Sequence, residues 1–228
     1  MIISVSGKIG SGKDTVGKII QHLTSEWAEK DFKDTDMLET RSEWQIKKYA
    51  EKLKQIACII LGCTREQLED REFKEKELGE EWKFYRVTNQ YQTFIFDNLK
   101  DASESHGGYY IGQEVKLTPR KILQLLGTEA GRQIIHPNIW VNALMSEYKE
   151  SSQWIITDTR FPNELQAVKD RGGVTIKVLR PETDHLAGDH ASETALDNAT
   201  FDYVIVNDGS LKDLIDKVKE ILLKEDII

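Results

Sequence analysis

The chain has 228 residues, of which 39% are apolar, and a formal net charge of −8. This length suffices to bury one sizeable core, so a single domain over residues 1–228 is expected. The negative charge argues against broad binding to nucleic acid or anionic membranes, since both favour a basic surface. No apolar run reaches the roughly 18 residues of a membrane span, and the N-terminus lacks signal-peptide features. A soluble, cytoplasmic protein is expected.

The first fifteen residues carry the strongest signal. An apolar strand over Met1–Val5 leads through a glycine-rich loop into Gly12-Lys13, and helical spacing begins at Val16. A strand, G-x-x-x-x-G-K and a helix are typical of a phosphate-binding loop. Glycines let the backbone approach an anion, and the helix N-terminus and the lysine add positive charge. We predict a triphosphate site formed by Gly10, Ser11, Gly12, Lys13, Asp14 and Thr15.

The residue after the lysine departs from the usual pattern. Asp14 replaces the Ser or Thr that ordinarily ligates Mg²⁺, and the hydroxyl group follows one place later at Thr15. This shifted form is common among small-molecule kinases that act on nucleoside monophosphates, so it favours them over GTPases. We predict Asp14 and Thr15 as ligands of Mg²⁺, directly or through water. A second interpretation is that Asp14 only stabilises the first helical turn through the helix dipole.

The middle of the chain is less regular. A short strand is expected within Trp44–Ala50 and an amphipathic helix over Leu53–Leu61. Residues 64–82 are highly charged, which is typical of solvated helix faces. Residues 83–117 carry aromatics, a Gly-Gly pair and alternating segments. They predict a hairpin-bearing insertion rather than a second domain.

The two cysteines, Cys58 and Cys63, lie in an apolar stretch. Their spacing matches neither a zinc site nor a Cys-x-x-Cys redox motif. We therefore expect two buried free thiols in a reducing compartment.

Helices return after residue 117. Thr118 is predicted to cap a helix that starts at Pro119 and ends near Gly127. Thr128 is then predicted to cap a second helix, and a third helix is centred on Trp140. Strands and helices alternate over the rest of the chain.

The apolar strands of this last part predict a parallel sheet covered on both faces, in a three-layer α/β fold of the P-loop NTPase type. Ligands of such sheets lie at the carboxyl ends of the strands. The expected strands are Gln153–Thr157, Val174–Leu179 and Phe201–Val206, and the expected helices are Pro162–Arg171 and Leu211–Leu223.

Asp158 and Arg160 follow the first of these strands. Asp158 is placed to reach Mg²⁺ or an acceptor, and Arg160 can form a bidentate contact with a phosphate. The alternative is structural: Asp158 caps the next helix, and Arg160 pairs with a surface acid.

Arg180 opens a loop over about 180–200 that has no periodicity, and such a length suggests a lid. The loop contains His190, which is either a ligand or a structural residue, and Glu193. The segment Asn207–Ser210 follows the last strand. It is predicted to be a turn and helix cap that could also border an adenine ring.

Phosphoryl transfer between two nucleotides needs a donor cradle, a cationic acceptor pocket, Mg²⁺ and exclusion of water. Lys13 serves the donor. An acceptor phosphate is already anionic, so no strongly tuned catalytic base is required. The cations available for the remaining phosphates are Lys54, Arg120, Arg132, Arg160 and Arg180.

Taken in order, these segments resemble the bacteriophage-type deoxynucleoside monophosphate kinases, in the nucleoside monophosphate kinase-like branch of P-loop proteins. Besides the loop, the resemblance is carried by Tyr49-Ala50 to Lys54, Leu126 to Glu129 with Trp140-Val141, Asp158-Thr159-Arg160, Arg180-Pro181, His190 to Glu193, and Asn207 to Ser210. It implies ATP- and Mg²⁺-dependent phosphorylation of a dNMP to a dNDP, in the host cytoplasm for a phage protein. No nucleic acid or membrane partner is expected, and a homodimer is left open.

The resemblance also distributes roles over the chain, with an acceptor-binding insertion at about 50–150. The catalytic residues would be Lys13, Arg132, Asp158 and Arg160. ATP would contact the loop residues together with Arg180 and Asn207. The substrate-binding residues would be Lys54, Arg120, Gln124, Gly127, Thr128, Arg132, Trp140, Asp158 and Glu193.

Two other functions share the loop. A kinase of another small metabolite, of the dephospho-coenzyme A or phosphomevalonate type, would keep the donor site and change the acceptor. An ATP-hydrolysing switch would act on a macromolecule. Against the switch, the chain lacks an Asn-Lys-x-Asp motif and an apolar run that ends in Asp-Glu.

Overall fold

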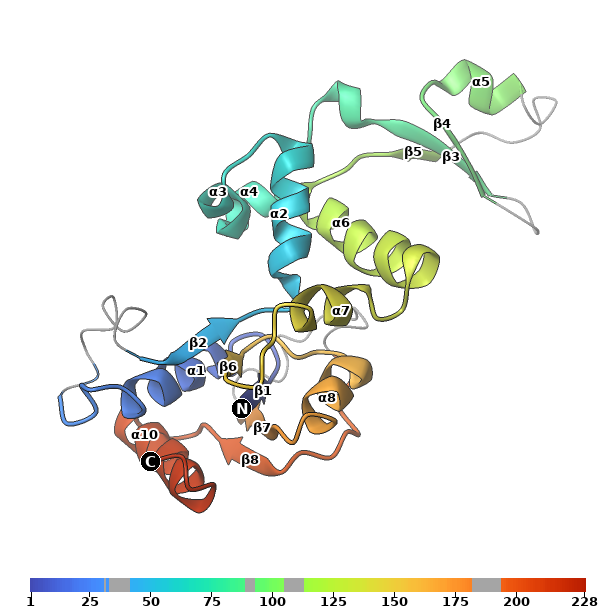
Figure 1. The fold of residues 1–228 in the computed structure, drawn as a ribbon. Helices are drawn as coiled ribbons and strands as arrows, with labels where there is room; N and C mark the ends of the chain where they lie inside the picture. The colour runs from blue at the N-terminus through green and yellow to red at the C-terminus, as the bar shows by residue number, and fades with distance from the viewer. Residues whose placement is uncertain (31, 33–41, 89–92, 105–112, 182–193) are drawn as a thin grey trace. The chain divides into compact units, whose positions relative to one another are not determined.

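The computed structural model describes residues 1–30, 32, 42–88, 93–104, 113–181 and 194–228. These residues divide into two compact units (Figure 1). The first unit comprises Met1–Lys52 and Asn138–Ile228, and the second comprises Leu53–Pro137. The expectation that the whole chain is one domain stays a prediction, and each unit is described by itself.

The first unit is built on a five-stranded sheet in the order β2-β6-β1-β7-β8. Every neighbouring pair of these strands is parallel, as predicted. The strands are β1 (Ile2–Ser6), β2 (Trp44–Lys47), β6 (Gln153–Ile156), β7 (Val174–Leu179) and β8 (Tyr203–Val206).

Helices cover both faces of this sheet, which confirms the three-layer α/β fold. The helices are α1 (Lys13–Leu23), α7 (Ile139–Met145), α8 (Pro162–Lys169) and α10 (Leu211–Lys224). Ile3 of β1 joins one buried cluster with residues of α1 and α10. Ile2, on the opposite face of the same strand, joins a second cluster with residues of α7 and α8. The alternation of side chains along the strand thus separates the two layers.

Two helices of this unit begin with clear caps. The Ser210 hydroxyl accepts a hydrogen bond from Asp213 N–H, so the predicted cap of α10 is confirmed. At the start of α8, the buried carboxylate of Glu164 accepts hydrogen bonds from the N–H groups of Arg160 (2.7 Å) and Phe161 (3.1 Å). A carboxylate that binds helix N-terminal N–H groups satisfies donors that lack helical partners.

The second unit contains an antiparallel sheet in the order β4-β3-β5. Its strands are β3 (Phe84–Thr88), β4 (Thr93–Phe96) and β5 (Gln113–Val115), and α5 (Leu99–Glu104) packs against the first two. The hairpin predicted within residues 83–117 is therefore confirmed.

Short helices make up much of the rest of this unit. They are α3 (Arg65–Glu69), α4 (Arg71–Glu75), the 3₁₀ turn η2 (Glu80–Trp82) and α6 (Pro119–Gln124). The helix α2 (Ala50–Leu61) begins in the first unit and continues into the second. Most of residues 64–82 are exposed, which confirms their interpretation as solvated helix faces, although Leu68 is fully buried.

The predicted helix break near Gly127 is wrong. Thr118 caps α6 as expected, but the helix then continues as a π-helical segment, η3 (Leu125–Ile135), through Gly127 and Thr128. A Cβ atom on Gly127 would lie 3.0 Å from Leu53 Cδ2. This glycine therefore allows close packing instead of ending the helix.

The cysteine prediction is right in one respect and wrong in another. Cys58 and Cys63 are free thiols, as expected, but both are half-buried instead of buried. They lie where α2 ends in a turn at Gly62, which has a positive φ of 62°.

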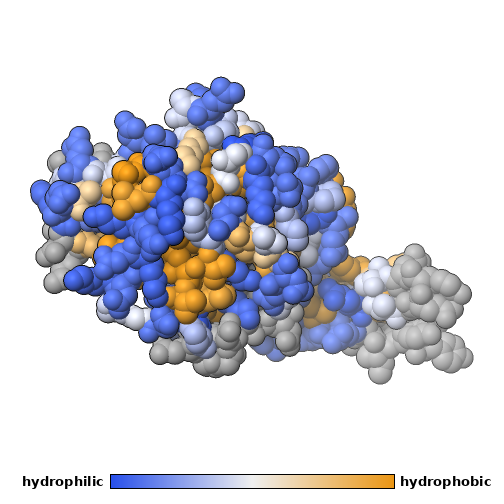
Figure 2. Space-filling view, turned by 90° about the horizontal axis from the view of Figure 1, so that it is seen from below, coloured by the Kyte–Doolittle hydropathy of each residue, from blue (hydrophilic) through white to orange (hydrophobic). Residues whose placement is uncertain are grey.

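Hydrophilic side chains dominate the face of the molecule in Figure 2, with separate hydrophobic groups among them. Among the described residues, no helix combines the length and apolar character needed to cross a membrane. Residues 182–193 of the predicted lid, with His190 and Glu193, lie outside the described part of the chain.

Candidate phosphate-binding site

The loop between β1 and α1 has the backbone geometry of an anion site. Gly10 and Gly12 have positive φ values of 78° and 93°, which residues other than glycine rarely adopt. Gly12 caps α1 without a side-chain hydrogen bond. The first turn of α1 therefore offers backbone N–H groups, and the positive end of the helix dipole, to an anionic ligand.

Lys13 adds a full positive charge to the same place. Its side chain is 8% exposed, and its ammonium group donates a hydrogen bond to the Lys8 carbonyl oxygen at 3.3 Å, across the loop. A full positive charge at a helix N-terminus adds to the positive end of the helix dipole. The arrangement therefore suits a ligand of high negative charge.

Asn207, which directly follows β8, supports the backbone of the loop. Its amide Nδ2 donates a hydrogen bond to the Ser11 carbonyl oxygen at 2.9 Å. A Cβ atom on Gly12 would lie only 2.6 Å from this nitrogen. The contact fixes the loop backbone; that Asn207 also touches ATP stays a prediction.

Gly12→Ala tests this geometry. We expect at least a tenfold loss of nucleotide affinity, because the new methyl group displaces Asn207 and the residue must keep a positive φ. Gly172→Ala is the matched control, since Gly172 also has a positive φ (64°) but nothing lies within 4 Å of its Cβ position. Titration of both variants with ATP checks the prediction, and equal affinities would contradict it.

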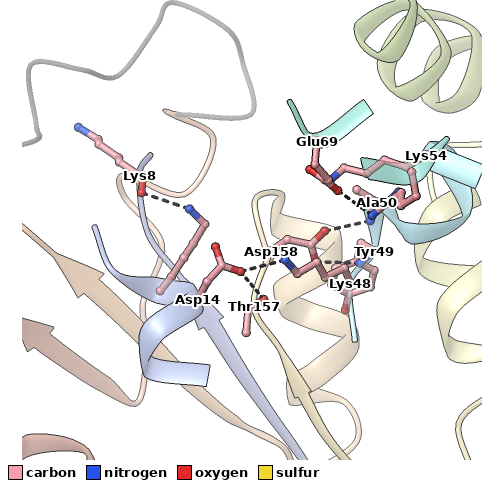
Figure 3. Close-up of polar contacts among 11 residues, drawn as sticks. Lys8, Asp14, Lys48, Tyr49, Ala50, Lys54, Glu69, Thr157 and Asp158 are labelled. Carbon is pink, nitrogen blue, oxygen red and sulfur yellow. Dashed lines mark hydrogen bonds and ion pairs between the residues drawn. The ribbon is translucent and has the colours of Figure 1, made fainter. Parts of the chain in front are cut away.

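Asp14 lies at the first turn of α1 and makes two contacts through one oxygen. Its Oδ1 accepts a hydrogen bond from Thr157 Oγ1 at 3.0 Å and lies 3.0 Å from Lys48 Nζ (Figure 3). Burial pushes the pKa of Asp14 upward, but Lys48, the Thr157 hydroxyl and Lys13 outweigh it and lower the pKa below its ordinary value. The carboxylate is therefore held in its charged form.

The charged Asp14 carboxylate and the neighbouring Thr15 hydroxyl provide the oxygen ligands that Mg²⁺ prefers. Among the described residues, no group of three or more His, Cys, Asp or Glu could hold a metal by itself. Mg²⁺ in nucleotide sites usually takes one or two protein oxygens and completes its shell with phosphates and water. The residues present fit that pattern.

Asp158 is engaged by the backbone. Its two carboxylate oxygens accept hydrogen bonds from the N–H groups of Tyr49 (2.8 Å) and Ala50 (2.9 Å) at the start of α2. Burial raises the pKa of Asp158, although these two N–H groups oppose the shift. The structural alternative, that Asp158 caps the helix after it, is wrong: Glu164 caps α8, and Asp158 caps α2. A contact of Asp158 with Mg²⁺ or substrate stays a prediction.

Several of the predicted acceptor residues lie in the second unit. Lys54 Nζ is 2.7 Å from Glu69 Oε1, Arg65 also pairs with Glu69, and Arg120 pairs with Glu75. Burial lowers the pKa of Lys74, and the nearby charges of Arg120 and Lys54 lower it further, while Glu69 opposes them. Cations from α2, α4 and α6 therefore gather in one place.

The other predicted site residues are more dispersed. Gln124 ends α6, while Gly127, Thr128 and Arg132 lie on η3 in the second unit. In the first unit, Trp140 is buried on α7 and Arg160 is half-buried after β6. Arg180 follows β7, two residues before the segment 182–193 that lies outside the described part of the chain.

Lys48, Thr157 and Lys74 were not among the residues predicted from the sequence. Lys48 and Thr157 directly follow β2 and β6. The rule that ligands lie at strand ends would have identified both residues if the predicted strands had ended at Lys47 and Ile156. Lys74 lies in the charged segment that was interpreted as a solvated face.

Comparisons with known proteins show the family of the chain. Residues 1–218 match the family model described as deoxynucleotide monophosphate kinase. The chain is 27% identical to the deoxynucleoside-5'-monophosphate kinase of Escherichia phage T5, over 91% of this chain and 89% of that protein. It is 31% identical to the deoxynucleotide monophosphate kinase of Escherichia phage RB69, over 45% of this chain and 44% of that protein. The chain therefore belongs to the deoxynucleotide monophosphate kinase family.

Proposed function

We propose that the protein transfers the γ-phosphate of ATP to a deoxynucleoside monophosphate, giving ADP and a deoxynucleoside diphosphate. The observation that carries the proposal is the loop before α1, where two positive-φ glycines, a helix N-terminus and the buried Lys13 converge. Family membership supports the choice of acceptor. It also makes a kinase of another small metabolite, or an ATP-hydrolysing switch, the less favoured alternative.

On the donor side, the loop N–H groups bind the phosphates of ATP and Lys13 neutralises the charge that develops during transfer. Asp14 and Thr15 would hold Mg²⁺, which would neutralise part of the negative charge of the donor phosphates. Asn207 keeps the loop backbone in place through Ser11.

On the acceptor side, the cations around Glu69 and Glu75 bind the phosphate of the dNMP. Lys54 and Arg120 are paired with these carboxylates in the structure. Both pairs are partly exposed, and such ion pairs contribute only about 0–1 kcal/mol, so an incoming phosphate can replace the carboxylate partner. Gln124, Gly127, Thr128, Arg132, Trp140 and Glu193 remain our candidates for contacts with the rest of the acceptor.

No general base is needed, because the attacking oxygen belongs to a phosphate that is already anionic. The arrangement of Asp158 supports this view, since both of its oxygens are occupied by backbone N–H groups. Asp158 then serves as a positioning residue at the start of α2, and Arg160 as a phosphate contact.

We also propose that the protein works in the cytoplasm of the infected host, because the relatives named above are phage proteins.

Release of ADP from ATP and Mg²⁺ tests the proposal. The assay is run first without an acceptor and then with dGMP, dTMP, dCMP, dAMP and the corresponding ribonucleotides, one at a time. We expect ADP only when one or more dNMPs are present. Equal ADP release without an acceptor would favour the ATP-hydrolysing switch, and no release under any condition would point to a different acceptor.

A further inference from the structure

Lys48 is a cation of the phosphate site to which the sequence analysis gave no role. It follows β2 directly, and its ammonium group lies 3.0 Å from Asp14 Oδ1 at the N-terminus of α1. The carboxyl end of β2 and the N-terminus of α1 thus meet at the edge of the sheet where a nucleotide is expected (Figure 3). Lys48 thus contacts Asp14, the residue that follows Lys13 in the sequence.

The ion pair between Lys48 and Asp14 is easily broken. The two side chains are 36% and 59% exposed. Exposed ion pairs contribute about 0–1 kcal/mol, because water and salt screen the attraction and two side chains lose freedom. A ligand with several negative charges therefore competes readily for the ammonium group.

Both ends of the pair remain fixed when it separates. Asp14 keeps its hydrogen bond from the Thr157 hydroxyl, and Thr157 is 1% exposed and so held in place. On the other side, the backbone that follows Lys48 is anchored, since the N–H groups of Tyr49 and Ala50 donate to Asp158. Only the flexible four-carbon stem of Lys48 has to move.

We propose that Lys48 is an exchangeable phosphate ligand: its ammonium group contacts Asp14 until a nucleotide binds, and then moves to a phosphate of that nucleotide. The inference rests on the proposed function, because it requires a nucleotide in the loop. In the empty protein the pair neutralises Asp14. In the loaded protein Lys48 adds a second mobile charge beside Lys13, and its departure frees the Asp14 oxygen it had occupied.

Binding of ATP in excess EDTA tests the role of Lys48 without any metal. We expect Lys48→Met to weaken ATP binding about tenfold, as for a lost hydrogen bond between charged partners. Lys52→Met is the matched control, since Lys52 forms a similarly exposed ion pair with Glu147 (2.7 Å) in the same unit. Its ATP affinity should match that of the wild type.

A thermal double-mutant cycle of Lys48→Met and Asp14→Asn, also in EDTA, tests the exchange itself. We expect a coupling between the two residues in the empty protein and its loss at saturating ATP. A coupling that persists with ATP bound would overturn the proposal, because Lys48 would then have stayed on Asp14.

Lys13→Met separates a failure of this inference from a failure of the proposed function. If Lys13→Met weakens ATP binding and Lys48→Met does not, Lys48 is only a structural partner of Asp14 and the inference is wrong. If neither variant changes ATP binding, the loop is not the nucleotide site, and the proposed function falls together with the inference.

Discussion

Lys13→Met is expected to lower kcat by about 10²- to 10³-fold, the usual cost of removing one group that stabilises transition-state charge. The buried ammonium group places a full positive charge at the N-terminus of α1, and methionine keeps most of the volume of its stem. The variant should fold, because it replaces a buried charge with a side chain that needs no compensating anion. Steady-state ADP release and thermal unfolding are the two measurements.

Lys18→Met is the control for this variant, since Lys18 lies on the same helix and is exposed. It should leave both kcat and the unfolding temperature unchanged. Wild-type turnover in Lys13→Met would remove Lys13 from the site. An unfolded Lys13→Met protein would show instead that the residue supports the fold.

Asp158→Ala is expected to reduce stability and activity together. The change leaves the N–H groups of Tyr49 and Ala50 without their acceptor, and each unsatisfied donor costs about 1–3 kcal/mol when buried. For a chain of this length we expect a fall in unfolding temperature on the order of 5–10 °C. Turnover should fall as well, because Lys48 directly precedes the released segment.

Asp158→Asn separates a positioning role from a direct catalytic one. The amide keeps one oxygen acceptor, so its unfolding temperature should lie between those of the wild type and Asp158→Ala. If Asp158 is instead a ligand of substrate or metal, Asp158→Asn would lose as much turnover as Asp158→Ala despite its smaller fall in unfolding temperature. That result would contradict the role proposed here.

Local signals predicted the parts of the fold that local physics determines. The loop before α1 combines a strand, glycines and a lysine within fifteen residues, and the caps Thr118 and Ser210 bond to N–H groups three residues away. In each case the partners are close in sequence, so their spacing alone carries the information.

Contacts between distant residues could not be predicted in this way. The helix α2 starts at Ala50, three residues before the expected Leu53, because the acceptor for its first N–H groups is Asp158. Gly127 matched the pattern of a helix end, but it lies within η3 and packs against Leu53. The ion pair of Lys48 with Asp14 likewise depends on the order of strands in the sheet.

The position of β6 between β1 and β2 limits how this chain can change during evolution. Two consecutive residues at its end serve different neighbours: Thr157 binds Asp14 of α1, and Asp158 holds the start of α2. An insertion or deletion of one residue just before them would turn both side chains to the opposite side of the chain and away from these partners. The length of this strand is therefore more tightly constrained than that of a loop, and we expect tolerated insertions and deletions to fall elsewhere.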